Sequence, residues 1–260
     1  MSESPTEPSA ASSLAHEVVL VTGAARRLGA TIARRLHAHG ARVAVHCHHS
    51  SLEAESLVNG LNAGRPDSAI LLPADLLDLG ALPGLVANTV GAFGRLTAVI
   101  NNASTFYPTP VGDITAAQFD DLIGTNLRAP LFLVQAAAEE LRRHGGQVIN
   151  LVDIHATRPL KAHPVYCAAK AGLQMLTMSL ARELAPQVRV NGVAPGPILW
   201  PEGGAAMDPT VQQHILSRTA LKRVGHPDDI ARAVLFFMKD APYVTGQVLA
   251  VDGGRTVAGH

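Results

Sequence analysis

Short apolar runs rich in β-branched residues alternate with longer amphipathic stretches from Glu17 onward. Such runs, bounded by turn residues, are typical of buried strands, and the stretches between them have the length of helices. Seven strands are therefore predicted, over residues 18–22, 42–47, 69–72, 98–101, 147–152, 189–193 and 247–251. Helices are expected to begin near Gly29, Ser51, Leu79, Ala116, Val165 and Asp228.

Most of these strands are continuously apolar, which is expected when helices cover both faces of a parallel sheet. The pattern therefore predicts an α/β fold of the Rossmann type: one domain over residues 16–260, with a doubly wound, seven-stranded parallel sheet and helices on both faces. Residues 195–223 are rich in Pro and Gly and too long for an ordinary connection. We expect this segment to be a substrate loop, because ligands of such sheets bind beyond the carboxyl ends of the strands.

Composition narrows the possible functions. The 21 basic and 21 acidic residues balance, so neither a nucleic acid nor an anionic membrane is expected as a partner. The two cysteines, Cys47 and Cys167, lack metal-ligand spacing, which argues against a metal site or a disulfide and favours a cytoplasmic protein. Residues 1–15, rich in Ser, Pro and Glu, lack the features of a secretion signal and are expected to form a disordered tail.

A glycine-bearing turn follows the first predicted strand and leads directly into a helix. Such a turn presents backbone N–H groups and the positive end of a helix dipole to a phosphate. Gly23 and Gly29 would shape the turn, and Arg26, Arg27 and Leu28 would lie between them. Arg27 would add a permanent cation beside the phosphates of a dinucleotide.

The second strand ends in His46-Cys47-His48-His49-Ser50, where an NAD enzyme is expected to place a carboxylate on the ribose 2′-hydroxyl. A 2′-phosphate would instead meet donors there, so the predicted cofactor is NADPH. The alternative is that these histidines are solvated residues at a strand end. Further cofactor-lining residues are expected after the third, fourth and sixth strands: Asp75, Leu76, Asn102, Ala103, Ser104, Pro195, Gly196 and Ile198.

Tyr166 and Lys170 are four residues apart on a predicted helix and therefore share one of its faces. A nearby ammonium group is expected to lower the pKa of the phenol toward working pH, which suits a proton donor. Asp153 follows the preceding strand and is the candidate third member of this group. The alternative for Asp153 is that it caps a turn.

Taken together, these motifs resemble those of the short-chain dehydrogenases/reductases over residues 17–254. The matching segments are residues 22–29, 101–103, 166–170, 195–196 and 251–254, together with Asn126. Within that family the chain is similar to the pteridine reductases. Four features carry this similarity: Arg-Arg-Leu-Gly at 26–29, the histidine segment at 46–50, Asn-Asn-Ala-Ser-Thr-Phe-Tyr-Pro-Thr-Pro at 101–110, and Asp153, where most relatives carry Ser. It departs from the usual family pattern at Arg27, where a third glycine is common, and at His49, where pteridine reductases commonly have Arg.

The resemblance implies a role for each matching residue. Tyr166 would donate the proton, Lys170 would hold the nicotinamide ribose, Asp153 would hydrogen-bond Tyr166, and Asn126 would help to hold a water-linked relay. In the substrate pocket, Phe106 would stack on the pterin, Ser104 and Arg27 would contact both pterin and cofactor, and the pocket wall would include Trp200. The relatives also imply a homotetramer, assembled through the helices that carry Asn126 and Tyr166 and through the last strand.

The expected activity is therefore NADPH-dependent reduction of a dihydropterin, with oxidised pterins and dihydrofolate as further candidate substrates. Asp153 argues against a simple ketone, because an ionised carboxylate accepts hydrogen bonds only and repels a growing oxyanion; a protonated Asp153 could donate. One alternative is a reductase or dehydrogenase of a ketone or alcohol, such as a 3-oxoacyl thioester, a sugar or a steroid. The other is a nucleotide-binding sensor or scaffold without turnover.

Overall fold

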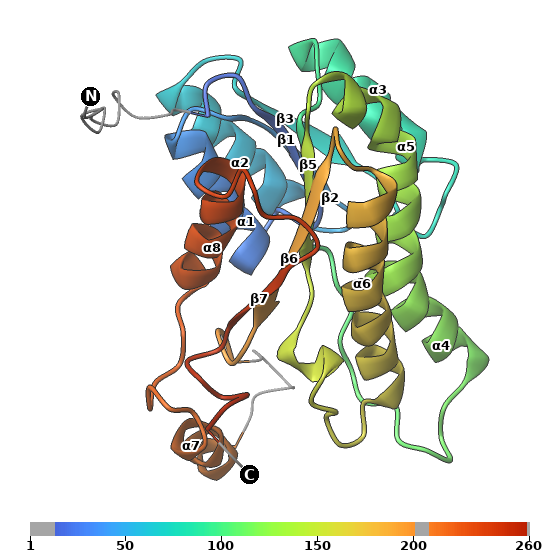
Figure 1. Cartoon of the computed structure of the whole chain (residues 1–260), viewed down its shortest axis with the longest axis vertical. Coiled ribbons are helices and arrows are strands. Elements are labelled where there is room, and N and C mark those ends of the chain that lie inside the picture. Colours follow the sequence, from blue (N-terminus) through green and yellow to red (C-terminus); the bar gives the residue numbers. More distant parts are fainter. Residues whose placement is uncertain (1–13, 201–207, 259–260) are drawn as a thin grey trace, which may run out of the picture.

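The computed structural model describes residues 14–200 and 208–258 (Figure 1). Within them, one seven-stranded sheet has the order β3-β2-β1-β4-β5-β6-β7, and each neighbouring pair of strands is parallel. The chain reverses direction across the sheet between β1 and β4, as in a doubly wound fold. The prediction of a seven-stranded, Rossmann-type parallel sheet is confirmed. The strands are β1 (Val18–Val21), β2 (Arg42–Cys47), β3 (Ala69–Pro73), β4 (Ala98–Asn101), β5 (Gln147–Leu151), β6 (Arg189–Pro195) and β7 (Val248–Val251).

Helices cover both faces of this sheet (Figure 1). One face carries α1 (Arg27–Ala38), α2 (Ser51–Gly64) and α8 (Pro227–Lys239), and the other carries α3 (Leu82–Phe93), α5 (Ala129–Arg143) and α6 (Pro164–Glu183). The remaining helical segments are α4 (Ala116–Ile123), η1 (Gly124–Arg128), η2 (Ile154–Ala156) and α7 (Pro209–Ser217).

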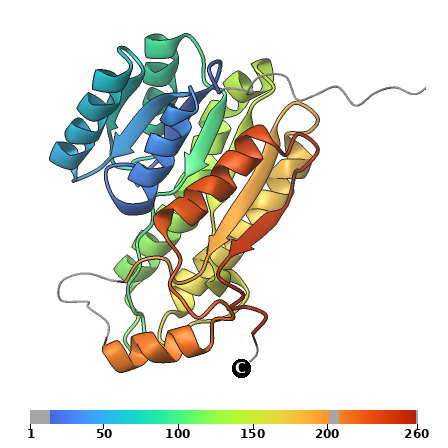
Figure 2. The ribbon, with the colours of Figure 1, turned by 90° about the vertical axis from the view of Figure 1, so that its left-hand side faces the viewer.

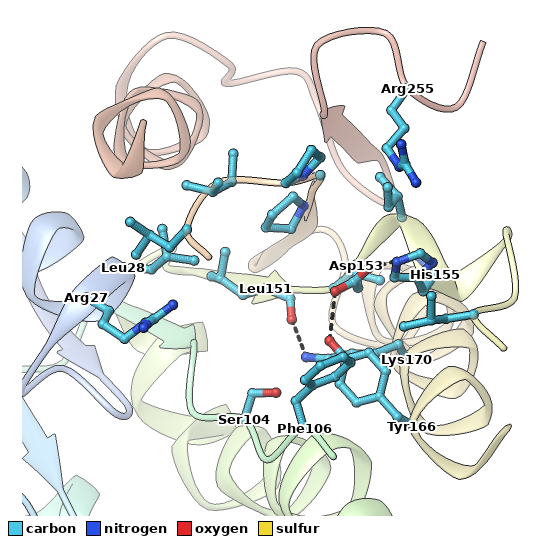
Figure 3. Close-up of a pocket in the computed structure, with 18 of the residues that line it drawn as sticks. Arg27, Leu28, Ser104, Phe106, Leu151, Asp153, His155, Tyr166, Lys170 and Arg255 are labelled. Carbon is cyan, nitrogen blue, oxygen red and sulfur yellow. Dashed lines mark hydrogen bonds between the residues drawn. The ribbon is translucent and has the colours of Figure 1, made fainter. Parts of the chain in front are cut away.

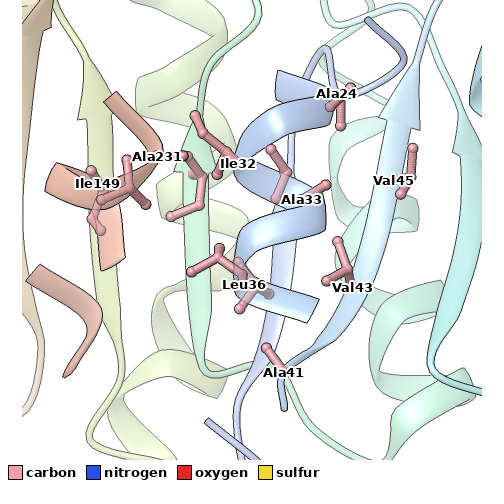
Figure 4. Close-up of a cluster of buried hydrophobic side chains, with 14 of the residues drawn as sticks. Ala24, Ile32, Ala33, Leu36, Ala41, Val43, Val45, Ile149 and Ala231 are labelled. Carbon is pink, nitrogen blue, oxygen red and sulfur yellow. The ribbon is translucent and has the colours of Figure 1, made fainter. Parts of the chain in front are cut away.

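Alternate strand residues supply two separate hydrophobic cores. Val19 and Val21 of β1 pack in the core under α1, α2 and α8. Figure 4 shows part of this core, with Ile32 and Leu36 of α1 and with Val43 and Val45 of β2. Val18 and Leu20 of the same strand pack in the core under α3, α5 and α6. Both sets of side chains are buried. Because the sheet has a core on each side, its strands need no polar face, and polar groups are concentrated at the strand ends.

Several boundaries differ from those predicted. The third helix begins at Leu82 rather than Leu79, because Asp78 closes a turn there: its side chain accepts from the backbone N–H of Gly80 at 2.9 Å. The helix expected from Ala116 is interrupted by the π-helical segment η1 before α5 continues.

The predicted tail and the predicted substrate loop are each described only in part. Of the tail expected over residues 1–15, residues 1–13 lie outside the described part, whereas Leu14 is buried and its N–H donates to the carbonyl of His39 at 2.7 Å. The loop expected over 195–223 contains the helix α7, which begins after Asp208; residues 201–207 of this loop lie outside the described residues. In Figure 2, α7 lies apart from the sheet and its helices, beyond the ends of β6 and β7.

Candidate active site

Two adjoining cavities lie at the carboxyl ends of the central strands. The smaller, of about 330 Å³, is walled by segments that follow β1, β4, β5 and β6 and contains Asp153, Tyr166 and Lys170 (Figure 3). The larger, of about 690 Å³, is walled by the glycine turn and the ends of β2, β3 and β4. Arg27 and Ser104 line both cavities. The two cavities therefore form the two ends of one crevice, at the place where a doubly wound sheet binds its ligand.

The glycine turn packs tightly against the end of β4. A Cβ at Gly23, whose φ is +60°, would lie 2.9 Å from Cα of Ala103, and a Cβ at Gly29 would lie 2.3 Å from the carbonyl oxygen of Gly23. The side-chain amide of Asn102 donates to the carbonyls of Thr22 at 2.9 Å and Gly23 at 3.0 Å. The predicted residues Gly23, Gly29, Asn102 and Ala103 are thus brought together, and only glycine fits at the first two positions.

Arg27 begins α1 with a φ of 51°, in the left-handed region. A residue with a Cβ is strained there by about 1 kcal/mol or more, which explains physically why glycine is common at this position in the family pattern. The guanidinium donates to the carbonyl of Trp200 at 3.4 Å. A strained arginine therefore places its cation at the junction of the two cavities.

His46 is buried at the end of β2, and the sequence alone did not reveal a role for it. Its Nδ1 accepts from the N–H of Gly23 at 3.1 Å, and its Nε2 lies 3.1 Å from the carbonyl oxygen of Ala74. Burial lowers the pKa of His46 to about 4. The ring is therefore neutral with its hydrogen on Nε2, and it ties the glycine turn to the end of β3. Its place in a predicted strand covered on both faces is the sequence signal that could have revealed this role, because each ring nitrogen of a buried histidine needs a hydrogen-bond partner.

The segment after β2 lines the larger cavity, with His48, His49 and Ser50 in the same wall as Arg26. The two histidine rings lie 3.5 Å apart between centroids. Among the described residues that line this cavity, the carboxylates come from elsewhere, Asp75 after β3 and Asp121 on α4. At the end of β2 this part of the crevice therefore offers imidazole and hydroxyl groups, which can donate hydrogen bonds, and no carboxylate from the described segment 48–50.

Asp153 and Tyr166 are joined directly. The phenol donates to Oδ2 of Asp153 at 2.7 Å, and the N–H of His155 donates to Oδ1 at 2.8 Å. Because both carboxyl oxygens accept hydrogen bonds, the bonding pattern is that of an ionised carboxylate. Burial and then the charge of Asp153 raise the pKa of Tyr166 well above its ordinary value. The phenol is therefore held in its protonated form.

Lys170 lies in the same cavity but points to the end of β5, where its Nζ donates to the carbonyl of Leu151 at 2.9 Å. Burial lowers its pKa to about 8, against the opposing effect of Asp153. Its Nζ is 5.7 Å from the centroid of the Tyr166 ring. The expectation that this ammonium lowers the pKa of Tyr166 was wrong for this arrangement, because the hydrogen-bonded carboxylate and burial outweigh the more distant cation.

Asn126 lies in the π-helical segment and is fully buried. Its Oδ1 accepts from the hydroxyl of Ser104 at 2.6 Å, and its Nδ2 donates to the carbonyls of Leu122 at 2.9 Å and Thr105 at 3.0 Å. The side chain therefore positions the segment after β4. Ser104 in turn lowers the pKa of the Tyr166 phenol, against the larger opposing effects of burial and Asp153. The expected water-linked relay through Asn126 stays a prediction.

The remaining predicted residues form the outer wall of the smaller cavity. Phe106 is 50% exposed; its ring stacks on His163, with centroids 4.6 Å apart, and meets Tyr166 edge-on at 4.8 Å. Pro195, Gly196, Ile198 and Trp200 lie opposite, and α7 contributes Ile215. Leu76, by contrast, lies with the larger cavity.

No helix in the described ranges combines the length and the apolar character needed to cross a bilayer. Residues 14–200 and 208–258 also contain no group of three or more His, Cys, Asp and Glu side chains placed to hold a metal ion.

A doubly wound parallel sheet with a tight glycine turn after β1, and a phenol and a carboxylate at its carboxyl edge, is typical of a dinucleotide-dependent α/β enzyme. Comparison with known proteins agrees. The family profile described as enoyl-(acyl carrier protein) reductase matches residues 23–256. Pteridine reductase 1 of Leishmania tarentolae is 36% identical, with 99% of each chain covered. The chain belongs to the short-chain dehydrogenase/reductase family and is an oxidoreductase of that family.

Relatives with other names are similarly close. The 3-oxoacyl-(acyl-carrier-protein) reductase FabG of Staphylococcus aureus is 36% identical, with 90% of this chain and 96% of the relative covered. Versicolorin reductase 1 of Aspergillus parasiticus is 33% identical, with 92% and 95% covered. Sequence identity to these relatives therefore does not distinguish between their substrates, and the chemistry of the site has to be considered.

Proposed function

We propose that this protein is an NADPH-dependent pteridine reductase that converts a dihydropterin to the tetrahydro form, with oxidised pterins and dihydrofolate as further candidate substrates. The observation that carries the proposal is the Asp153 carboxylate, hydrogen-bonded to Tyr166 at 2.7 Å on the wall of the smaller cavity. The similarity to pteridine reductase 1 over the whole chain supports it.

The chemistry of Asp153 distinguishes a pterin from a ketone. Ketone reduction develops negative charge on oxygen, which needs hydrogen-bond donors, and an ionised carboxylate beside it is unfavourable. A pterin reacts at a ring C=N bond and presents N–H donors along its edge, which a carboxylate can accept. Both oxygens of Asp153 already accept from the protein, which supports the ionised form on which this argument depends.

The proposed cofactor fits the residues of the larger cavity. The amide groups at the start of α1 and the cation of Arg27 would face the phosphates, while His48, His49 and Ser50 would surround the 2′-phosphate. Bound NADPH would supply the hydride. Lys170 would hold the nicotinamide ribose, because this residue of α6 lines the smaller cavity and its Nζ is held at the carbonyl of Leu151, at the end of β5.

The chain's own side chains would bind the ring and deliver the proton. Phe106 presents a half-exposed aromatic ring at the cavity, and a flat ring system packs favourably against it. Tyr166 would give the proton of its hydroxyl to a ring nitrogen as that nitrogen becomes basic on hydride addition; the raised pKa keeps the hydroxyl protonated at neutral pH until then. Asp153 would orient that hydroxyl until the proton is transferred, and its charge would favour rapid return of a proton to the phenolate from solvent.

The decisive test is NADPH oxidation with dihydrobiopterin, dihydromonapterin and dihydrofolate beside a panel of short ketones. We expect turnover of the pterins, and a large loss of it in Asp153→Ser. The alternative function, reduction of a ketone such as a 3-oxoacyl thioester, a sugar or a steroid, has the support of the FabG and versicolorin relatives. Ketone turnover without pterin turnover would establish that alternative. NADPH binding without any turnover would indicate a sensor or scaffold.

We propose in addition a homotetramer in the cytoplasm. Large apolar side chains are exposed on α4, α6 and the edge strand β7, at Phe119, Met175, Met178 and Leu249, and such patches are typical of interfaces. Both cysteines are free and buried, which suits a reducing compartment. Light scattering on the purified protein should give four times the chain mass of 27.2 kDa, and Leu249→Lys should reduce it.

A further inference from the structure

A third cavity, of about 350 Å³, adjoins the smaller cavity of the active site on the side away from the glycine turn. The two share four lining residues, Ile154, His155, Leu160 and Arg255. In Figure 3, Arg27 and Arg255 stand at opposite sides of the pocket, and the Arg255 side chain is directed toward His155. A ligand placed beside Asp153 can therefore extend past His155 into this third cavity.

This third cavity is strongly basic. Arg158, Arg218 and Arg255 line it together with His155, and none of its described lining residues is acidic. Arg158 donates to the carbonyl of Thr256 at 2.7 Å and Arg255 to that of Ile215 at 2.9 Å. Each guanidinium carries five N–H donors, so these bonds position the two groups and leave donors for a ligand.

The arginines of this cavity lack carboxylate partners among the residues that the structure describes. Asp252, three residues before Arg255, accepts from the N–H groups of Gly254 and Thr256, both at 2.8 Å. Burial and the charge of Arg218 lower the pKa of Arg255, against the opposing effect of Asp252. An anion between Arg218 and Arg255 would relieve their repulsion.

We infer that the third cavity is a subsite for an anionic tail of the substrate, so that the preferred substrate is a pterin whose side chain ends in carboxylates or a phosphate. The inference rests on the proposed pteridine reductase function, because it assumes that the ring lies between Phe106 and Asp153. Guanidinium groups recognise carboxylate and phosphate alike through paired hydrogen bonds. Dihydrofolate, with its glutamyl tail, and a dihydroneopterin phosphate represent the two sources.

The kinetic test uses Arg218→Gln, because Arg218 lines the third cavity and is absent from the described walls of the two active-site cavities. With NADPH saturating, we expect the KM for the preferred anionic pterin to rise about tenfold, as for the loss of one charge-assisted hydrogen bond. The KM for dihydrobiopterin, whose side chain is uncharged, should stay unchanged. Arg182→Gln, at an exposed arginine near the far end of α6, is the matched control. The substrate whose KM rises more in Arg218→Gln, dihydrofolate or the dihydroneopterin phosphate, shows whether the subsite prefers a carboxylate or a phosphate tail.

A binding test separates this inference from the proposed function. Trp200 is the single tryptophan of the chain and lines the adjoining cavity, so its fluorescence reports binding without turnover. p-Aminobenzoyl-glutamate should bind more tightly than its uncharged diamide, and Arg218→Gln should abolish the difference. If pterins are not reduced but this difference is present, the function is wrong and the subsite stands. If pterins are reduced and Arg218→Gln changes neither the binding difference nor the KM of either anionic pterin, the subsite is wrong.

Discussion

His46 makes the stability of this protein sensitive to mild acid. Its Nδ1 must stay unprotonated to accept from Gly23, and its Nε2 donates to Ala74. A second proton would break the bond to the glycine turn and place a charge in a side chain that is 1% exposed. The folded protein therefore resists protonation at this position, whereas the unfolded chain does not.

The size of the effect follows from the two pKa values of His46, 6.5 in the unfolded chain and about 4 in the folded protein. Between these values the unfolded chain binds a proton that the folded protein does not, so the free energy of unfolding falls as the pH falls. Between pH 7 and pH 5 the loss is about 2 kcal/mol, and it approaches about 3 kcal/mol below pH 4.

Urea denaturation at pH 7 and pH 5 tests this value. His46→Asn keeps an acceptor near Gly23 but does not titrate, so we expect it to lose about 2 kcal/mol less than the wild type over this interval. His214→Asn, at an exposed histidine on α7, is the control and should behave like the wild type. Equal losses in the wild type and His46→Asn would show that His46 is not the buried neutral histidine described above.

Three further predictions concern the crevice. Arg27→Gly should be more stable than Arg27→Ala by about 1 kcal/mol in urea denaturation, because glycine adopts the positive φ of this position without strain. Both variants should bind NADPH at least tenfold more weakly than the wild type if the Arg27 cation contacts a phosphate. The pKa of the buried Lys170 is about 8 in the folded protein and 10.5 in the unfolded chain, so its contribution to the free energy of unfolding should rise with pH between these values. Lys170→Met should lack this rise. The same pH dependence of stability in the wild type and in Lys170→Met would contradict the burial of Lys170. Phe106→Ala should raise the KM for a dihydropterin far more than that for NADPH, and equal increases would count against stacking.

The strands and the catalytic spacing could be predicted because they depend on local pattern. Continuous apolar runs place β1 to β7 within a few residues, and the four-residue spacing places Tyr166 and Lys170 on one turn of α6. The helix α7 was missed because it is short, contains no buried residue and lies in a segment rich in Pro and Gly. The interruption at η1 was missed because a π-helical turn has no distinct hydrophobic period.

The amino-acid sequence by itself determined the order of strands and helices, the glycine positions of the turn and the identity of the groups at the carboxyl edge of the sheet. Tertiary structure alone decided other partners: Nζ of Lys170 bonds the carbonyl of Leu151 rather than acting on the phenol of Tyr166, and His46 is buried between Gly23 and Ala74. The reason is that hydrogen bonds and pKa values depend on distance and burial. These are settled only when segments far apart in the chain pack together.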